Sequence, residues 1–455
     1  MDFRRFSVSR ITLVAIVVGM ATLTARGAKT EGRYAVVVSN ATFAKADWRK
    51  VVDALQAKHG AAVHQYKTTP AEALGALKKD FPKYACFVAT PAEAGKKFVA
   101  DVHQLTRKLD DDPYTDLLWG ILTGYDADNA LRIAKQAAPL TIKRVASGTE
   151  VELEMCNEGL WYCELKKHRM VRKRPGGKPA EEKGPADTTQ ALVNTLNTYK
   201  AQLFITSGHA TERDWQIGFR YRNGSFRCKN GQLYGLDTQK RRFDVKSSNA
   251  KVYLAVGNCL MGHINSPNAM ALAWMNSAGV TQMVGYTVPT WFGYGGWGCL
   301  DYFVEQPGRY TMTEAFFANH HALVHKLSNS PGSAARGLKF DRDVVAFYGD
   351  PAWEARMDQA PNAWDQKLTE SKGTFTFTIK PNRGTATFEP ININGSQRGY
   401  RPIVAYLPHR IKDVKIIKGG DLRPAITDNF LLIPNPRKCD PKKTYELVFT
   451  ATKVE

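Results

Sequence analysis

Two stretches, LFITSGHA at residues 203–210 and VYLAVGNC at residues 252–259, decide the fold that this sequence predicts. Each begins with an apolar run that is too short for a helix and lacks strict alternation, which is typical of a strand buried on both faces. Such strands occur in parallel sheets that are covered by helices. Reacting groups in these sheets collect at the carboxyl ends of the strands, so we expect His209 and Cys259 at the same edge. The sequence therefore predicts an α/β fold built on a mostly parallel sheet flanked by helices.

The chain on either side of these stretches continues the alternation of strand and helix that a parallel sheet requires. Strands are predicted from apolar runs and helices from their spacing and end signals. The predicted strands are Tyr34–Val38, Ala61–Tyr66, Tyr84–Ala89 and Val280–Tyr286. The predicted helices are Trp48–Lys58, one beginning near Asp126 after the stretch Leu117–Gly124, Gln190–Lys200, Asn268–Ser277 after the Ser266-Pro267 start signal, and one from Thr313 to about Leu327. Two Asn-Gly pairs, at residues 223–224 and 230–231, predict hairpin turns between the two strands that precede His209 and Cys259.

The pattern changes past about residue 370, where short strands are separated by Pro, Asn and Gly turns. This spacing predicts a C-terminal antiparallel β-sandwich. Its predicted strands are Thr374–Ile379, Thr385–Phe388, Ile403–Leu407, Val414–Ile417, Phe430–Ile433 and Tyr445–Thr450.

At 455 residues the chain exceeds the roughly 250–300 residues of a single core, so we expect several domains. The predicted divisions are a signal peptide at 1–27, an N-terminal α/β subdomain at 28–140, a catalytic subdomain at 141–369 and the sandwich at 370–455. Residues 166–187 are basic and rich in turn formers, so they are predicted to form an exposed loop.

The first residues have the features of a secretory leader. Three arginines precede the apolar run Ile11–Leu23, and Ala25-Arg26-Gly27 then offers small residues, Ala25 and Gly27, at a cleavage site. The run falls short of the roughly 20 residues that span a bilayer, so no stable membrane insertion is predicted. We therefore expect a protein that is secreted, periplasmic or held at the cell surface.

The formal net charge is +20, which attracts anionic partners. No nucleic-acid-binding module accompanies this charge, so no nucleic-acid partner is predicted. The sequence does not define the oligomeric state. Seven cysteines leave at least one thiol unpaired within an exported chain, and Cys156 and Cys163 lie close enough in sequence for a local bridge. None forms a CxxC pair, so a structural zinc site has little support.

Two other clusters have the composition of metal sites. Asp110, Asp112 and Asp116 are close in sequence and could hold a structural calcium ion, or they form an acidic surface turn. His321 and His325 share one helix face at a spacing that suits a transition metal, but no third ligand accompanies them.

A thiolate is a nucleophile, and a histidine within reach can accept its proton or donate one to a departing amine. Attack on an amide creates an oxyanion, which needs fixed N–H donors. The turn at Gly208–Ala210 can supply one donor, and the N–H of Cys259 can supply another.

These motifs resemble those of the caspase–hemoglobinase fold. Ile205–Ala210 is similar to its strand-then-His-Gly signature, and Val256–Gly262 is similar to its strand-then-Ala-Cys signature. More specifically, the chain resembles the gingipain-like cysteine peptidases, which carry a secretion signal and an immunoglobulin-like C-terminal sandwich. Three further segments support this resemblance: Asp112–Gly124, Val284–Gly296 and Tyr348–Pro351.

The resemblance implies a cysteine endopeptidase that acts on protein or peptide substrates through a thioester acyl-enzyme and requires no cofactor. It implies His209 as general acid/base, Cys259 as nucleophile, and the N–H groups of Ala210 and Cys259 as the oxyanion hole. By the same resemblance, the segment with Tyr286, Thr287 and Trp291 shapes the substrate pocket.

The chain departs from the family pattern at two positions, with Ala210 where the family has Gly and Asn258 where it has Ala. These departures motivate an alternative, a catalytically inactive caspase-fold binding protein that uses its basic surface and its sandwich. A third hypothesis is a metal protein that uses Cys259, His263 and the face with His321 and His325.

Overall fold

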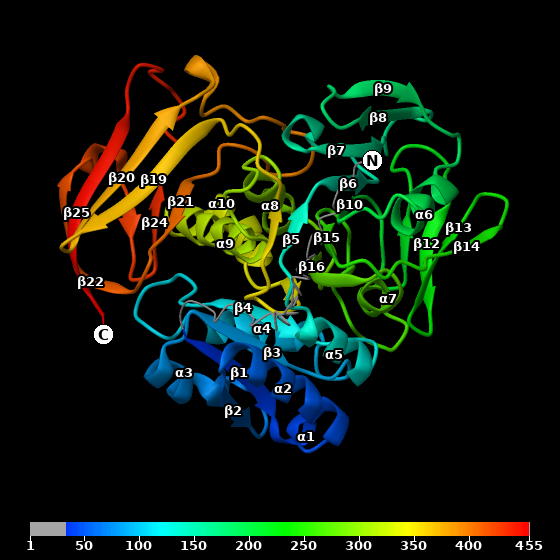
Figure 1. The fold of residues 1–455 in the computed structure, drawn as a ribbon, viewed down its shortest axis with the longest axis horizontal. Coiled ribbons are helices and arrows are strands. Elements are labelled where there is room, and N and C mark those ends of the chain that lie inside the picture. Colours follow the sequence, from blue (N-terminus) through cyan, green and yellow to red (C-terminus); the bar gives the residue numbers. More distant parts are fainter. Residues whose placement is uncertain (1–32, 455) are drawn as a thin grey trace, which may run out of the picture.

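A twelve-stranded sheet organises the α/β part of the molecule (Figure 1). The computed structural model describes residues 33–454, so the predicted leader at 1–27 lies outside the described residues. The strands follow the order β2-β1-β3-β4-β17-β16-β15-β10-β6-β7-β8-β9. Their bounds are β1 Tyr34–Ser39, β2 Ala62–Tyr66, β3 Tyr84–Val88, β4 Leu118–Leu122, β6 Arg144–Ser147, β7 Glu158–Tyr162, β8 Arg169–Lys173, β9 Ala180–Lys183, β10 Leu203–Thr206, β15 Lys251–Ala255, β16 Val280–Tyr286 and β17 Val345–Tyr348.

The sheet consists of two parallel blocks that run in opposite directions. Strands β2, β1, β3, β4 and β17 are mutually parallel, and so are β16, β15, β10, β6 and β7. The blocks meet where β16 pairs antiparallel with β17. The prediction of a large, mostly parallel sheet is confirmed, and β10 and β15 belong to the same block.

Helices flank this sheet (Figure 1). The predicted helices correspond to α2, α5, α6, α7 and α9 and begin and end close to the predicted positions, whereas α1, α3, α4, α8 and α10 were not predicted. Helix α9 carries a capping box at Thr311, two residues before the predicted cap. Helix α7 begins at Met270, so Pro267 precedes the helix instead of opening it. The helices are α1 Asn40–Phe43, α2 Ala46–His59, α3 Leu74–Asp80, α4 Lys96–Leu105, α5 Ala127–Lys135, α6 Thr189–Asn197, α7 Met270–Ser277, α8 Tyr294–Phe303, α9 Met312–Ser328 and α10 Ser333–Asp341.

The basic segment 166–187 is a hairpin, which corrects the prediction of an irregular loop. Strands β8 and β9 extend the sheet beyond β7 by antiparallel pairing. Arginines on β8 pair across the hairpin with glutamates on β9, at 3.0 Å for Arg169–Glu181 and 3.1 Å for Arg172–Glu182. Opposite charges facing each other across strands stabilise the pairing, although the segment lacks an apolar run.

Short accessory strands complete the α/β part. β5 (Leu140–Ile142) pairs with β18 (Ala355–Met357). A separate antiparallel sheet contains β11, β12, β13 and β14, which span Asp214–Gln216, Ser225–Lys229, Gln232–Leu236 and Arg242–Asp244. Asn230-Gly231 forms the predicted hairpin turn between β12 and β13, and both residues have a positive φ. Asn223-Gly224 lies at the end of the longer loop, residues 217–224, that joins the paired strands β11 and β12, and neither residue has the positive φ of a two-residue hairpin turn.

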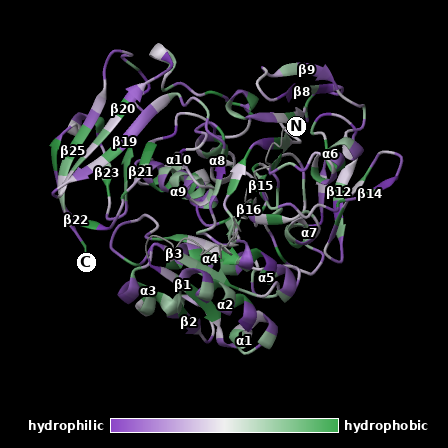
Figure 2. Cartoon of the chain, viewed as in Figure 1, coloured by the Kyte–Doolittle hydropathy of each residue, from purple (hydrophilic) through white to green (hydrophobic). Residues whose placement is uncertain are grey.

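The C-terminal part forms two antiparallel sheets around one core. One has the order β19-β20-β25-β22 and the other β21-β24-β23. The prediction missed β19, which spans the predicted boundary at 369/370, and the predicted strand Thr385–Phe388 contains a 3-10 turn instead. The strands are β19 Trp364–Ser371, β20 Thr374–Pro381, β21 Ile403–Tyr406, β22 Ile411–Lys418, β23 Ala425–Ile426, β24 Phe430–Ile433 and β25 Tyr445–Lys453. Figure 2 shows mixed hydrophilic and hydrophobic residues along β20 and β25, as expected for strands with one solvated face.

The smaller C-terminal sheet is buried on both faces and joins this module to the α/β part. On β24, Leu431 and Ile433 belong to the C-terminal core, whereas Phe430 and Leu432 belong to the α/β core. The Phe430 ring stacks on His321 of α9 with centroids 4.0 Å apart. The two parts therefore share a packed interface.

The cysteines of the described chain are all free thiols, so the bridge considered between Cys156 and Cys163 is not formed. Within residues 33–454, none of the helices combines the length and apolar character that crossing a bilayer requires.

Candidate active site

The predicted reacting residues follow two strands that lie side by side. β10 and β15 are parallel neighbours, with Thr206 opposite Ala255 in the register. His209 comes three residues after this pair on one strand, and Cys259 comes four residues after it on the other. Because the strands are parallel and in register, both side chains emerge from the same edge of the sheet.

Both side chains have access to solvent. His209 is exposed and Cys259 is partly exposed, whereas the strands that carry them are buried. The backbone N–H of Thr290 donates a hydrogen bond to Cys259 Sγ at 3.2 Å. This bond holds the sulfur beside the loop that follows β16.

Asn258 joins the two turns. Its amide Nδ2 donates to the carbonyl of Gly208 at 3.0 Å, and its Oδ1 accepts a hydrogen bond from Thr206 Oγ1. The side chain is fully buried. The Asn258 side chain therefore connects the turn before Cys259 to the turn before His209.

Ala210 adopts an ordinary backbone conformation. Gly208 has a φ of +91°, whereas the φ of Ala210 is not positive. The extra methyl group at position 210 therefore introduces no backbone strain of the left-handed kind. Ala210 forms an isolated antiparallel bridge with Trp215, and within residues 33–454 the N–H groups of Ala210 and Cys259 have no hydrogen-bond acceptor.

Glu164 forms hydrogen bonds that hold the turn before His209, a role that the sequence did not indicate. Its carboxylate accepts hydrogen bonds from Ser207 Oγ at 2.5 Å and from Thr149 Oγ1 at 2.6 Å. Burial raises the pKa of this carboxyl, which the two hydroxyl donors partly oppose. Gly208 has a φ of +91°, which favours glycine, and a Cβ at this position would lie 3.3 Å from Glu164 Oε2.

Phe219 is a second contact that the sequence did not indicate. Its ring stacks on the imidazole of His209 with centroids 4.8 Å apart and an interplanar angle of 27°. The backbone N–H of Phe219 donates to the carbonyl of Glu164 at 2.6 Å. Glu164 therefore positions both the turn before His209 and the ring that stacks on it.

The three residues predicted to shape the substrate pocket have different environments. Tyr286 is fully buried and donates to Asp341 Oδ2 at 3.0 Å, and Thr287 is buried and donates to the carbonyl of Val344 at 3.0 Å. Trp291 is 80% exposed and directly follows Thr290, which contacts the Cys259 sulfur. Of the three, Trp291 alone presents its side chain to solvent.

A loop of the C-terminal module reaches the cysteine turn through Trp297. A Cβ built at Gly257 would lie 2.8 Å from the Trp297 ring, and one at Gly395 would lie 2.4 Å from it. The indole is therefore packed between the turn that carries Cys259 and the loop after β20. Side chains at either glycine would push these parts of the chain away from the indole.

The predicted calcium residues do gather in space. Asp110, Asp112 and Asp116 each bring a carboxylate oxygen within 4.8 Å of the others. Burial, followed by repulsion from Asp110, raises the pKa of Asp116 to about 8, and burial raises the pKa of Asp112 to about 6. Backbone N–H groups within the loop also donate to these carboxylates.

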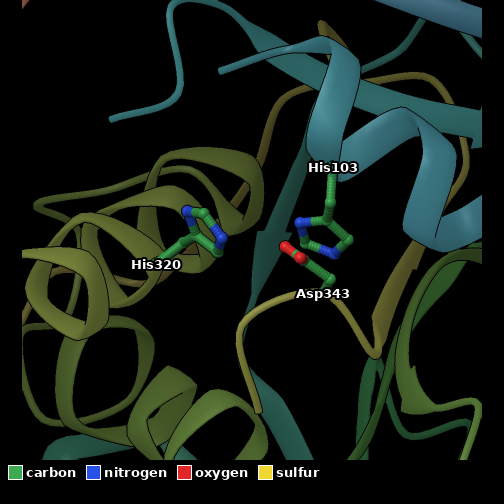
Figure 3. A group of neighbouring side chains, drawn as sticks. All are labelled: His103, His320 and Asp343. Carbon is green, nitrogen blue, oxygen red and sulfur yellow. The ribbon is translucent and has the colours of Figure 1, made fainter. Parts of the chain in front are cut away.

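A second group with metal-binding atoms comprises His103 on α4, His320 on α9 and Asp343 before β17 (Figure 3). Asp343 is already paired with Arg107 at 2.7 Å and with Arg342 at 3.0 Å. Both nitrogens of His320 are within hydrogen-bond distance of protein oxygens. The two arginines and these bonds favour a structural polar cluster over a metal centre.

The remaining histidines do not assemble the third hypothetical site. His321 lies in the core against Phe430, and His325 Nδ1 lies 2.9 Å from the hydroxyl of Tyr114. Among residues 33–454, no group of three metal-binding side chains includes Cys259 or His263.

Comparisons with known proteins give one distant similarity. No family model matches the chain, and no curated protein matches it. A solved structure described as "Structure of Protease" superimposes with a TM-score of 0.45 at 11% sequence identity, and the match covers 93% of this chain and 97% of that chain. A similarity this distant does not define the family of this chain.

Proposed function

We propose that this protein is a cysteine endopeptidase in which Cys259 is the nucleophile and His209 is the general acid/base. The observation that supports this most is the pairing of β10 with β15, after which an exposed imidazole and an accessible thiol follow at the same edge. We also propose that the protein is gingipain-like, that it is exported after loss of residues 1–27, and that its C-terminal module is immunoglobulin-like.

In the proposed reaction, His209 accepts the proton of the Cys259 thiol, and the thiolate attacks the carbonyl carbon of the scissile peptide bond. The N–H groups of Ala210 and Cys259, which have no acceptor among residues 33–454, are available to stabilise the oxyanion. Collapse of the intermediate releases the amine, which takes a proton from His209, and leaves a thioester on Cys259. His209 then acts as base for a water molecule that attacks the thioester. This step releases the carboxylic acid product and restores the Cys259 thiol.

The substrate is proposed to be an extended peptide that passes between exposed aromatic rings. Trp291 is 80% exposed and Phe219 is 45% exposed, and each is tied to one reacting turn. Large flat rings of this kind can contact peptide side chains with little loss of rotamer entropy.

The two departures that motivated an inactive binding protein have structural roles that are compatible with catalysis. Ala210 has no left-handed strain, and Asn258 holds the two turns together.

The proposal is tested by incubating a denatured proteome with the full chain and sequencing the new peptide ends. We expect recurrent cleavage sites that disappear with Cys259→Ala and His209→Ala. Absence of cleavage by the wild-type chain, including after removal of residues 1–32, would favour the binding protein.

A further inference from the structure

A cavity of about 790 Å³ lies where the N-terminal half of the sheet meets the C-terminal module. Its walls come from the end of α3, the starts of β3 and β4, the link between β21 and β22, and the last residues of β25. In Figure 1, α3 and the C-terminal end of the chain lie on the same side of the molecule. The volume falls within the roughly 300–1,000 Å³ of small-molecule sites. Strands β17 and β16 separate this region from β15 and β10, so it is distinct from the candidate active site.

The cavity is strongly cationic. Six basic side chains line it: Arg33, Lys78, Lys79, Lys83, Arg410 and Lys453. Within residues 33–454, the ammonium groups of Lys78, Lys79 and Lys453 have neither a hydrogen-bond nor an ion-pair partner. Unpaired charges of one sign in a concave wall concentrate ligands of the opposite sign.

The two acids in the wall leave this positive charge in place. Asp80 is already paired with His64, with 2.7 Å between Nε2 and Oδ2. The carboxylate of Asp116 accepts a hydrogen bond from the backbone N–H of Leu109 at 2.8 Å and lies within 4.8 Å of the carboxylates of Asp110 and Asp112, so it is engaged within the acidic loop.

The wall also contains apolar side chains. Leu117, Leu118 and Leu407 are buried beside the basic groups. Phe81 has a φ of +40°, which is rare for a bulky residue, and its ring lies 3.5 Å from the guanidinium carbon of Arg410. Arg410 is itself fixed by an ion pair with Asp428. Phe81 is the left-handed residue that ends α3, and its backbone N–H donates to the carbonyl of Leu77, so the helix end fixes this side chain in the wall.

We propose that this cavity binds an anion that carries an apolar tail. A carboxylate or phosphate would contact Lys78, Lys79 and Lys453, and a hydrocarbon chain would lie along Phe81, Leu117 and Leu407. A free fatty acid and an anionic membrane lipid share this chemistry. The proposal concerns binding alone and does not depend on peptidase activity.

The test is calorimetric titration of the full chain with decanoate and decyl phosphate. Decanol tests the need for charge, and acetate and inorganic phosphate test the need for a tail. We expect both amphiphilic anions to bind at least tenfold more tightly than decanol, acetate or phosphate. The double variant Lys79→Glu/Lys453→Glu should weaken decanoate binding at least tenfold. The charge-matched control Lys178→Glu/Lys246→Glu, at exposed lysines outside the cavity, should bind as the wild type does.

A second arm identifies the source of the anion. A membrane lipid would be identified if the wild-type protein is retained on phosphatidylglycerol vesicles but not on phosphatidylcholine vesicles. This retention should be lost in the Lys79→Glu/Lys453→Glu variant and should be competed by decanoate. Decanoate binding without vesicle retention would identify a free acid. Equal affinity for decanol and decanoate, unchanged binding by the double variant, or no binding of either anion at millimolar concentration would overturn the proposal.

Discussion

The side-chain amide of Asn258 donates a hydrogen bond to the backbone carbonyl of Gly208, 3.0 Å away. The same side chain accepts a hydrogen bond from Thr206, at the end of β10. The residue before the proposed nucleophile thus fixes the turn that leads to the proposed general base. One buried amide therefore links the turns that carry the two proposed reacting side chains.

Replacing Asn258 with Ala should separate the two turns. The substitution removes two buried hydrogen bonds, each of which contributes about 1 kcal/mol. We expect kcat/KM for peptide cleavage to fall about tenfold or more, with a modest decrease in Tm. Asn276→Ala is the matched control, because Asn276 Nδ2 also donates to a glycine carbonyl, that of Gly231 at 3.0 Å, in a distant hairpin. Equal activity of the Asn258→Ala protein and the wild type would argue against this coupling.

Glu164→Gln should loosen the histidine turn. Both carboxylate oxygens accept hydrogen bonds, from Ser207 and Thr149, whereas an amide offers one accepting oxygen. We expect a fall in kcat/KM of about tenfold and changed NMR chemical shifts for the His209 imidazole. The exposed pair of Glu181 with Arg169 provides the control, because Glu181→Gln should leave both measurements unchanged. Unaltered His209 chemical shifts in the Glu164 variant would show that this carboxylate has no positioning role.

His321 should make the fold sensitive to acid. Burial lowers the pKa of this imidazole to about 3, against about 6.5 in the unfolded chain. Because the folded state resists protonation, stability present above pH 6.5 is lost as the pH falls toward 3. At pH 5 the loss is about 2 kcal/mol. His321→Phe, which retains an aromatic ring against Phe430, should flatten urea unfolding energies between pH 7 and pH 5, whereas an unchanged slope would assign the acid sensitivity to other groups.

The calcium site stays a prediction, and its pH dependence can test it. The pKa of Asp116 is raised to about 8, so the folded state loses stability as the pH rises toward 8 and this carboxyl ionises without a cation. Added calcium should therefore raise Tm more at pH 8.5 than at pH 6 in the wild type, and not in Asp112→Asn/Asp116→Asn. A calcium effect of the same size in that variant would place any bound ion elsewhere.

The central strands could be predicted because their residues are apolar without alternation. β10, β15 and β16 are buried along their whole length, which matches the pattern of a helix-covered parallel sheet. The register between β10 and β15 could not be predicted, because a slip of one residue would bury either strand equally well. The reversal between β16 and β17 also leaves no local signal in the sequence.

Elements that depend on charge or on distant partners were missed. β19 has mostly exposed polar residues and is stabilised by its pairing with β20, so no apolar run marks it. β8 and β9 depend on cross-strand ion pairs. Glu164 contacts Ser207 only after folding brings together residues that are 43 positions apart.

Two of the residues expected in the substrate pocket, Tyr286 and Thr287, are buried. Their side chains form hydrogen bonds with residues that precede β17.

The most direct measurement is covalent labelling of Cys259 by a peptide that carries a thiol-directed electrophile, followed by mass spectrometry. If His209 activates this thiol, the wild-type chain should be modified at Cys259, and the His209→Ala protein should react at least a hundredfold more slowly, while His325→Ala reacts at the wild-type rate. Equal rates of labelling in the wild type and His209→Ala would contradict the proposal that these two side chains act together.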